Sequence, residues 1–168
     1  MEIEVIKGDI TKLAVGAIVN ASDKKFSGAG GVDLAIHRAA GRELAEACDK
    51  LGGGKTGQAK ITRGYKLPAD YVIHTVGPVF GKEGGKEAEL LADCYKNCFK
   101  LAKENGIRLI AFPAISTGTY GYPKKEAAQI AVAAVKEFCD LNSAGFDKII
   151  FTCFDDENFK IYKSLLEL

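Results

Sequence analysis

The sequence lacks tryptophan altogether and contains one methionine and two histidines among its 168 residues. It also lacks an excess of either charge, because 23 lysines and arginines nearly balance 22 aspartates and glutamates and leave a formal net charge of +1. Proteins that bind duplex nucleic acid usually carry a clustered basic face for the phosphates. The lysines and arginines here are scattered, so the composition argues against DNA as a partner.

Long hydrophobic runs are absent as well. No apolar stretch approaches the roughly 18 residues that a membrane-spanning helix needs. The first residues, Met1 to Val5, show neither the basic nor the apolar segment of a signal peptide. We therefore expect a soluble, cytoplasmic protein without a membrane partner, folded as one compact domain over residues 1–168.

The five cysteines form no CxxC pair, and their number is odd. This usage is typical of reduced thiols in a reducing compartment. Cys94 and Cys98 fall on one helix face, but neither His37 nor His74 stands at a ligand spacing to them. The sequence therefore predicts small buried thiols, with no metal site and no other cofactor.

Apolar periodicity predicts strands that alternate with helices. The expected strands are 2–6, 17–19, 59–64, 70–76, 108–115 and 147–153, and the expected helices are 32–51 with a break near Gly41, 86–105, 124–140 and 156–167. Several of these strands are too apolar to have a wet face, which is typical of a sheet covered on both sides. The pattern predicts a three-layer α/β/α domain with a largely parallel sheet.

Five polar or glycine-bearing segments follow predicted strands or open helices. They are 7–11, 19–23, 27–33, 114–123 and 153–158. In open α/β sheets, ligands bind outside the carboxyl ends of the strands. These segments are the candidate site.

The stretch GAGGVD, residues 28–33, opens a predicted helix. Glycines let the backbone approach a ligand closely, and free amides at a helix start suit a phosphate or diphosphate. A dinucleotide fingerprint starting at Gly28 would require glycine where the chain has Asp33. A flexible loop before an ordinary helix start is the alternative.

A second glycine-bearing turn, STGTYGYP, follows the apolar strand that ends near residue 114. It offers hydroxyls from Ser116, Thr117 and Thr119, backbone freedom at Gly118, and the face of Tyr120 for a sugar. Together with the first loop it would clamp one diphosphate.

Asp9 and Phe154 follow the first and last strands. Asp9 is a candidate acceptor for an exocyclic amine such as that of adenine, and Phe154 is a candidate to stack on a base. The alternatives are that Asp9 caps a short helix from Thr11 and that Phe154 belongs to the core.

With these segments in order, the sequence resembles the macro domain family and its MacroD-like branch. The resemblance covers essentially the whole chain and is carried by GDIT (8–11), AIVNAS (17–22), GGVDLAIHRAAG (30–41), LPADYVIHTVGP (67–78), PAISTGTYGYP (113–123) and CFDDENFKIYKSLL (153–166). It implies a three-layer α/β/α fold with a mixed, mostly parallel sheet that binds ADP-ribose in a crevice.

The resemblance also implies roles for individual residues. Asp9 would bind the adenine amine, with Ile10 contacting the base and Phe154 bordering it. Ser116 to Tyr120 would hold the diphosphate and the distal ribose together with three residues of the first loop, Gly30, Gly31 and Val32.

In similar proteins the reaction removes mono-ADP-ribose from acidic side chains, or the acetyl group from O-acetyl-ADP-ribose. Asn20 would orient the distal ribose, and Asp33 would be the catalytic carboxylate. Such a hydrolysis needs a positioned water and a carboxylate to orient it or accept its proton, but no metal ion.

One departure from the family concerns Asp23, also a catalytic candidate, because the family's NAAN reads NASD here. An amide donates a hydrogen bond, whereas an ionised carboxylate only accepts. Either Asp23 stays protonated and still donates, or it points into solvent and activity falls. The alternative function is a non-catalytic reader of ADP-ribose.

A third class of function, binding of single-stranded RNA or poly(ADP-ribose), would use the same groove. The balanced charge and the lack of an aromatic series along one face argue against it.

Overall fold

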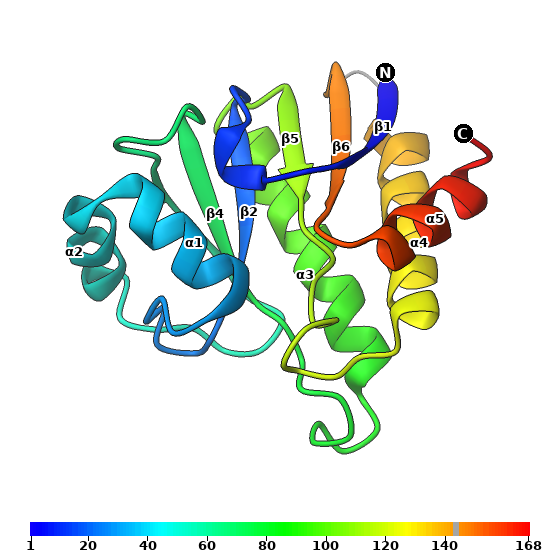
Figure 1. Ribbon diagram of the computed structural model, residues 1–168, viewed down its shortest axis with the longest axis horizontal. Helices are drawn as coiled ribbons and strands as arrows, with labels where there is room; N and C mark the ends of the chain where they lie inside the picture. The colour runs from blue at the N-terminus through cyan, green and yellow to red at the C-terminus, as the bar shows by residue number, and fades with distance from the viewer. Residues whose placement is uncertain (143–144) are drawn as a thin grey trace.

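A six-stranded sheet between helices forms the frame of the molecule (Figure 1). The computed structural model describes residues 1–142 and 145–168. The strands are β1 (Glu2–Lys7), β2 (Ala17–Ser22), β3 (Ala59–Arg63), β4 (Tyr71–Val76), β5 (Leu109–Phe112) and β6 (Lys148–Cys153). The helices are α1 (Gly31–Ala40), α2 (Arg42–Lys50), α3 (Glu87–Glu104), α4 (Lys124–Asn142) and α5 (Asp156–Leu166), with a short 3-10 turn, η1 (Ile10–Lys12).

The sheet has the order β1-β6-β5-β2-β4-β3. Its neighbouring strands pair in parallel, except that β3 runs antiparallel to β4. The prediction of a mixed, mostly parallel sheet is therefore confirmed. Because five strands point the same way, their carboxyl ends gather at one edge, where α/β sheets hold their ligands.

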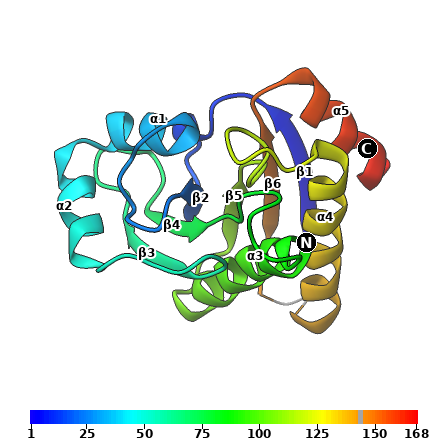
Figure 2. The same ribbon diagram turned by 90° about the horizontal axis from the view of Figure 1, so that it is seen from below.

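Two apolar cores, one on each face, hold the three layers together. Along β2, Ala17 and Val19 enter the core under α3 and α4, whereas Ile18 enters the core under α1 and α2. Helices α1 and α3 lie on opposite sides of the sheet in Figure 2, and α5 packs beside α4. This alternation also places Asn20 and Ser22, which follow Ile18 at a spacing of two, on the α1 side.

Two strand ends differ from the sequence-based boundaries by more than one residue. Strand β2 continues to Ser22 instead of stopping at Val19, because Asn20 and Ser22 are buried polar residues that an apolar pattern does not register. Strand β5 stops at Phe112, because Pro113 has no N–H to donate to a ladder. The predicted break at Gly41 is confirmed, and its φ of 89° is one that glycine adopts readily.

The turn between β3 and β4 yields a stability prediction. A Cβ at Gly64 would lie 2.1 Å from the carbonyl oxygen of Ala69, and the Gly64 amide donates to Asp70 O at 2.8 Å. We expect Gly64→Ala to lower the free energy of unfolding by about 1 to 3 kcal/mol, since backbone must move to admit the methyl group. Chemical denaturation measures the loss. Gly8→Ala is the control, because nothing lies within 4 Å of a Cβ there, and an equal loss in both variants would contradict the prediction.

Candidate active site

A crevice of about 850 Å³ opens at the carboxyl ends of the parallel strands. Its lining residues come from the segments 8–10, 21–23, 29–35, 113–120 and 152–158, together with Gly77 and Lys124. All five loop segments singled out in the sequence therefore meet in one place. The topology explains the meeting, since each of these segments follows a parallel strand or opens the helix after it.

The first wall of the crevice is the start of α1. Gly30 is the N-cap and provides no side-chain cap, so the first amides of the helix are left for another acceptor. Nothing lies within 4 Å of a Cβ at Gly30 or Gly31, which leaves space for a ligand against the backbone. At Gly28, by contrast, a Cβ would lie 2.9 Å from the His37 ring. This wall suits an anion.

The second wall is the loop after β5. Ser116 adopts a left-handed φ of 67°, and its carbonyl accepts a hydrogen bond from the amide of Tyr122 at 2.9 Å. Thr117 Oγ1 donates to Ala114 O at 2.9 Å. A Cβ at Gly77 would lie 2.3 Å from Ser116 Oγ, so this loop rests directly on the end of β4. The strained Ser116 conformation is thus maintained by its surroundings, as is common at ligand sites.

Asp33 lines the crevice between these walls but is only 4% exposed. Its Oδ1 accepts a hydrogen bond from Asn20 Nδ2 at 2.7 Å. Its Oδ2 accepts from Ser22 Oγ at 2.9 Å and from the amide of Gly28 at 3.0 Å. His37 Nε2 lies 3.5 Å from Oδ1. These contacts hold the carboxylate in one orientation and compensate its burial.

Asn20 lies beneath the crevice and does not line it. Its side chain is fully buried and reaches two partners, Asp33 and His74. Its Oδ1 has no hydrogen-bond partner among the residues that the structure describes. In this arrangement Asn20 acts on the crevice through Asp33.

Asp23 lines the crevice and is turned toward its own loop. Its Oδ1 accepts from the amides of Lys25 and Ser27, each at 3.0 Å, and its Oδ2 accepts from Ser27 Oγ. Partial burial alone would raise the pKa of Asp23, but the hydrogen bonds from Ser27 and from backbone amides outweigh it and lower the pKa from its ordinary value. Asp23 is therefore ionised at neutral pH, which contradicts the alternative of a protonated donor.

Tyr120 also lines the crevice. Burial raises the pKa of its hydroxyl, and the nearby carboxylates of Asp23 and Asp33 raise it further. The group is therefore a neutral phenol at neutral pH, able both to donate and to accept a hydrogen bond.

Asp9, Ile10 and Phe154 meet at another part of the crevice. Asp9 Oδ1 accepts from Thr11 N at 2.9 Å and from Thr11 Oγ1 at 2.7 Å, so it does cap the short turn η1. These hydrogen bonds from Thr11 lower the pKa of Asp9. Phe154 is 89% exposed, which makes the core alternative wrong. Its ring is free to contact a ligand.

Three buried polar residues that line the crevice received no individual role in the sequence analysis. Ser22 and Asn158 lie inside the segments 19–23 and 153–158, whereas Thr152 lies in the apolar pattern of β6. Asn158 is buried in the first turn of α5, where its amide donates to Asp155 Oδ1 at 2.7 Å. Within the described ranges, Thr152 Oγ1 and Asn158 Oδ1 have no hydrogen-bond partner. Only their positions, inside or next to the segments already singled out, could have indicated a role for these residues.

Other expectations can be placed against the structure. All five cysteines are free thiols, four of them buried. No helix within residues 1–142 and 145–168 is long and apolar enough to span a bilayer. The same residues contain no cluster of three or more histidine, cysteine, aspartate or glutamate side chains that could hold a metal ion.

The contacts of Asp33 yield a second stability prediction. In Asp33→Asn an NH₂ group replaces one oxygen and faces a donor, either Asn20 Nδ2 or the amide of Gly28. We expect the free energy of unfolding to fall by about 1 to 3 kcal/mol, because a buried donor loses its acceptor. Thermal or urea denaturation measures the change. Asp156→Asn, at the exposed ion pair with Lys7, is the control and should change stability little. Equal effects of the two substitutions would rule out a tightly bonded Asp33.

Comparisons with known proteins agree with this geometry. The Macro domain family profile matches residues 19–131. The chain is 56% identical to a macro domain-containing protein of Chlorobaculum tepidum, over 98% of this chain and 95% of that protein. It is 52% identical to the O-acetyl-ADP-ribose deacetylase of Escherichia fergusonii, over 98% of this chain and 94% of that protein. It is 53% identical to the human ADP-ribose glycohydrolase MACROD2, over 96% of this chain, but spans only 38% of that longer protein.

Solved structures show the same likeness. The Oceanobacillus iheyensis macrodomain with ADP has a TM-score of 0.93 at 41% identity, covering 98% of this chain and 90% of that one. The Trypanosoma brucei macrodomain in complex with ADP-ribose also has a TM-score of 0.93 at 41% identity, covering 98% of this chain and 69% of that one. With a family match over most of the chain and relatives above half identity, this protein belongs to the macro domain family.

Proposed function

We propose that this protein binds ADP-ribose and hydrolyses esters at its distal ribose. The substrates are proteins carrying mono-ADP-ribose on acidic side chains, O-acetyl-ADP-ribose, or both. The observation that carries the proposal is Asp33, a buried and oriented carboxylate that lines the crevice directly after the uncapped start of α1. Relatives named ADP-ribose glycohydrolase and O-acetyl-ADP-ribose deacetylase support it.

The two glycine-bearing walls explain how the diphosphate is held. Gly30, Gly31 and Val32 present helix-start amides, and the loop Ser116 to Tyr120 faces them across the crevice. Backbone donors fixed in this way bind an anion without reorganisation. With the diphosphate there, the base extends toward Asp9, Ile10 and Phe154, where a carboxylate can accept from the adenine amine and an exposed ring can stack.

The distal ribose then lies toward Asp33. The carboxylate orients a water molecule or accepts its proton as the water attacks the ester. The bond between the acyl carbon and the ribose oxygen breaks, and the ribose oxygen takes up the proton that the water lost, so the products are a carboxylic acid and ADP-ribose. Hydrogen bonds from Asn20, Ser22 and Gly28 keep the carboxylate aimed while this happens. The water positioned by the carboxylate does not need a metal ion.

A second function, a reader that binds ADP-ribose without turnover, is favoured by one observation. Asp23 is an ionised acceptor where the family's pattern has an amide that can donate. Its oxygens, however, are already occupied by Lys25 and Ser27. The hydrolase remains our conclusion because Asp33 and its partners are complete without Asp23.

Turnover and binding together test the function. We expect the protein to release ADP-ribose from a mono-ADP-ribosylated substrate or acetate from O-acetyl-ADP-ribose. Asp33→Ala should reduce kcat by about 10² to 10⁴, the usual contribution of a positioned acid or base, while calorimetry still detects ADP-ribose binding. If both substrates survive the wild-type protein although ADP-ribose binds, the reader function holds. If ADP-ribose produces no saturable heat, both functions fail.

Substitution of Asp23 separates the two functions further. In Asp23→Asn the remaining carbonyl oxygen can still accept from the Lys25 and Ser27 amides, so the loop should keep its shape. We expect kcat to change by less than about tenfold, the effect of roughly one hydrogen bond. Single-turnover assays of both proteins provide the measurement. Activity that appears only in Asp23→Asn would show that the natural protein merely binds.

A further inference from the structure

A row of buried polar side chains crosses three strands beneath the crevice. Asn20 on β2 pairs in register with His74 on β4, and both side chains are fully buried. Thr62 on β3 is 9% exposed and continues the row. All three lie on the α1 and α2 side of the sheet, because side chains alternate along strands and register neighbours share a face.

The hydrogen bonds of this row determine the tautomer of His74. Asn20 Nδ2 carries two hydrogens, of which one goes to Asp33 Oδ1 at 2.7 Å and the other to His74 Nδ1 at 3.1 Å. His74 Nδ1 is therefore an acceptor, and the ring proton sits on Nε2. That N–H donates to Thr62 Oγ1 at 2.9 Å, and the Thr62 hydroxyl donates to Arg63 O at 3.1 Å.

The opposite orientation of the row is unfavourable. Turning the Asn20 amide over would place its carbonyl oxygen against the Asp33 carboxylate, two acceptors facing each other. It would also require the proton of His74 on Nδ1, which leaves Nε2 without a hydrogen for Thr62. The tautomer of His74 and the orientation of Asn20 are therefore set together.

His74 is uncharged in this setting. Burial is the larger cause and the nearby His37 the smaller, and together they lower its pKa to about 3. Cys48 Sγ lies 3.8 Å from Nε2, and the Phe26 ring lies with its centroid 5.8 Å from that of His74. The imidazole is therefore neutral at neutral pH and does not act as an acid toward the substrate.

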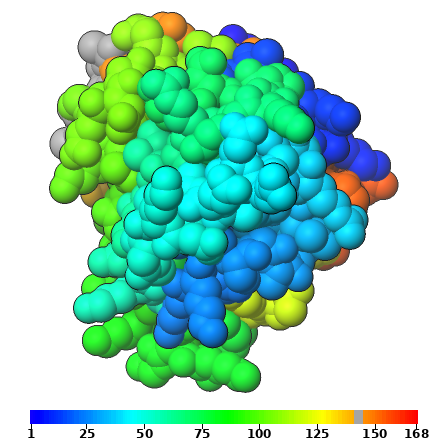
Figure 3. All heavy atoms as spheres, turned by 90° about the vertical axis from the view of Figure 1, so that its left-hand side faces the viewer, coloured from blue at the N-terminus to red at the C-terminus, as the bar shows by residue number. Residues whose placement is uncertain are grey.

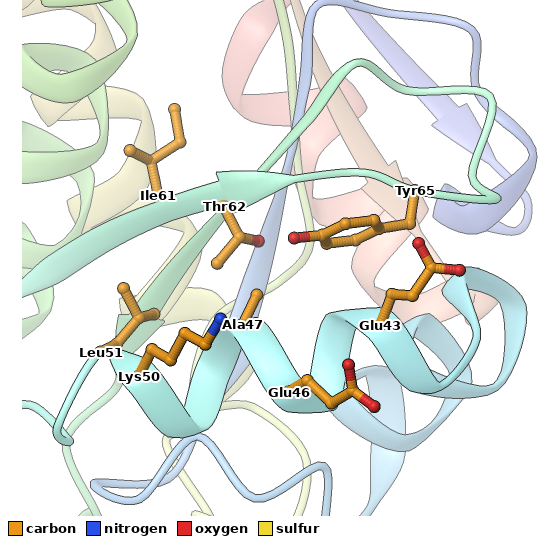
Figure 4. A pocket seen from close by; sticks show the side chains of 8 residues that line it. All are labelled: Glu43, Glu46, Ala47, Lys50, Leu51, Ile61, Thr62 and Tyr65. Carbon is orange, nitrogen blue, oxygen red and sulfur yellow. The ribbon is translucent and has the colours of Figure 1, made fainter.

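Thr62 does not line the crevice. It lines a separate groove of about 410 Å³ between α2 and β3, together with Glu43 and Tyr65 (Figure 4). Figure 3 shows this side of the molecule, with α2 and its neighbours in cyan across the middle. The groove and the crevice share no lining residue, and the side-chain hydrogen bonds of the row link Thr62 to Asp33 at the crevice.

We propose that His74 and Thr62 are positioning residues for hydrolysis, acting through the Asn20 amide to hold Asp33 Oδ1 in its productive orientation. The inference rests on the proposed function. Neither residue touches the ligand. Loss of the row should therefore slow the chemical step and leave the affinity for ADP-ribose unchanged.

The pair Thr62→Val and Thr62→Ser tests this, because valine keeps the size and loses the hydroxyl, whereas serine keeps the hydroxyl and loses the methyl group. Valine removes the acceptor for His74 Nε2–H, so kcat should fall about tenfold, the effect of one hydrogen bond of about 1.4 kcal/mol, with KM and the Kd for ADP-ribose unchanged. Serine keeps the hydroxyl and should restore kcat. Thr75→Val is the matched control, since Thr75 is also a buried threonine, on β4, but donates to Gln58 O at 2.9 Å and not to the row.

Two substitutions of His74 by amide residues test its role, because each places a polar group near a different ring nitrogen. The oxygen of His74→Asn stands near Nδ1 and preserves the acceptor for Asn20. The amide of His74→Gln reaches the place of Nε2 and leaves Asn20 without that acceptor. We expect the kcat of His74→Asn to exceed that of His74→Gln, with thermal unfolding confirming that both variants fold.

Nitrogen NMR of the imidazole gives a readout independent of turnover. The wild-type protein should show a protonated Nε2 and an unprotonated Nδ1 on His74, and Thr62→Val should show a mixture. A proton on Nδ1 in the wild type would overturn the inference. An active wild-type protein and a Thr62→Val variant with unchanged kcat would also overturn the inference. That result would leave the proposed function intact. A wild-type protein that binds ADP-ribose without turnover overturns both.

Discussion

The Asp33 carboxylate and its three donors are the constraint on which the site depends. They join elements far apart in the fold, because Asn20 and Ser22 come from β2, Gly28 from the loop before α1, and Asp33 from the first turn of that helix. A buried carboxylate is costly without such partners. The same contacts that make it tolerable therefore fix the glycine loop over the end of the sheet and aim one carboxylate at the crevice.

The parallel sheet supplies the other part of the site. Because β1, β2, β4, β5 and β6 all point toward one edge, loops from the beginning, middle and end of the chain meet there. The antiparallel strand β3 contributes nothing to the rim of the crevice. Strand β3 pairs with β4, and its Thr62 accepts the hydrogen bond from His74 beneath the crevice.

Much of this could be predicted from the sequence. The alternation of strands and helices follows from apolar periodicity, and the crevice segments follow from their places after strands. The contact between Asn20 and His74 could not be predicted, since it depends on the pairing of two strands that brings together residues 54 apart in the sequence. The orientation of Asp23 was also out of reach, because it depends on the path of the loop to Ser27 and on amides that carry no sequence signal.

The uncapped start of α1 has a consequence for how ligands arrive. Lys124 at the crevice has its ammonium engaged by Glu157 at 3.0 Å, and the chain as a whole carries a net charge of only +1. Attraction for an anion therefore comes mainly from peptide dipoles, whose fields decline over a short range, and not from long-range steering by surface cations. The rate of ligand association should therefore depend little on ionic strength. The shape of the crevice, and not long-range charge, then selects which ligands bind.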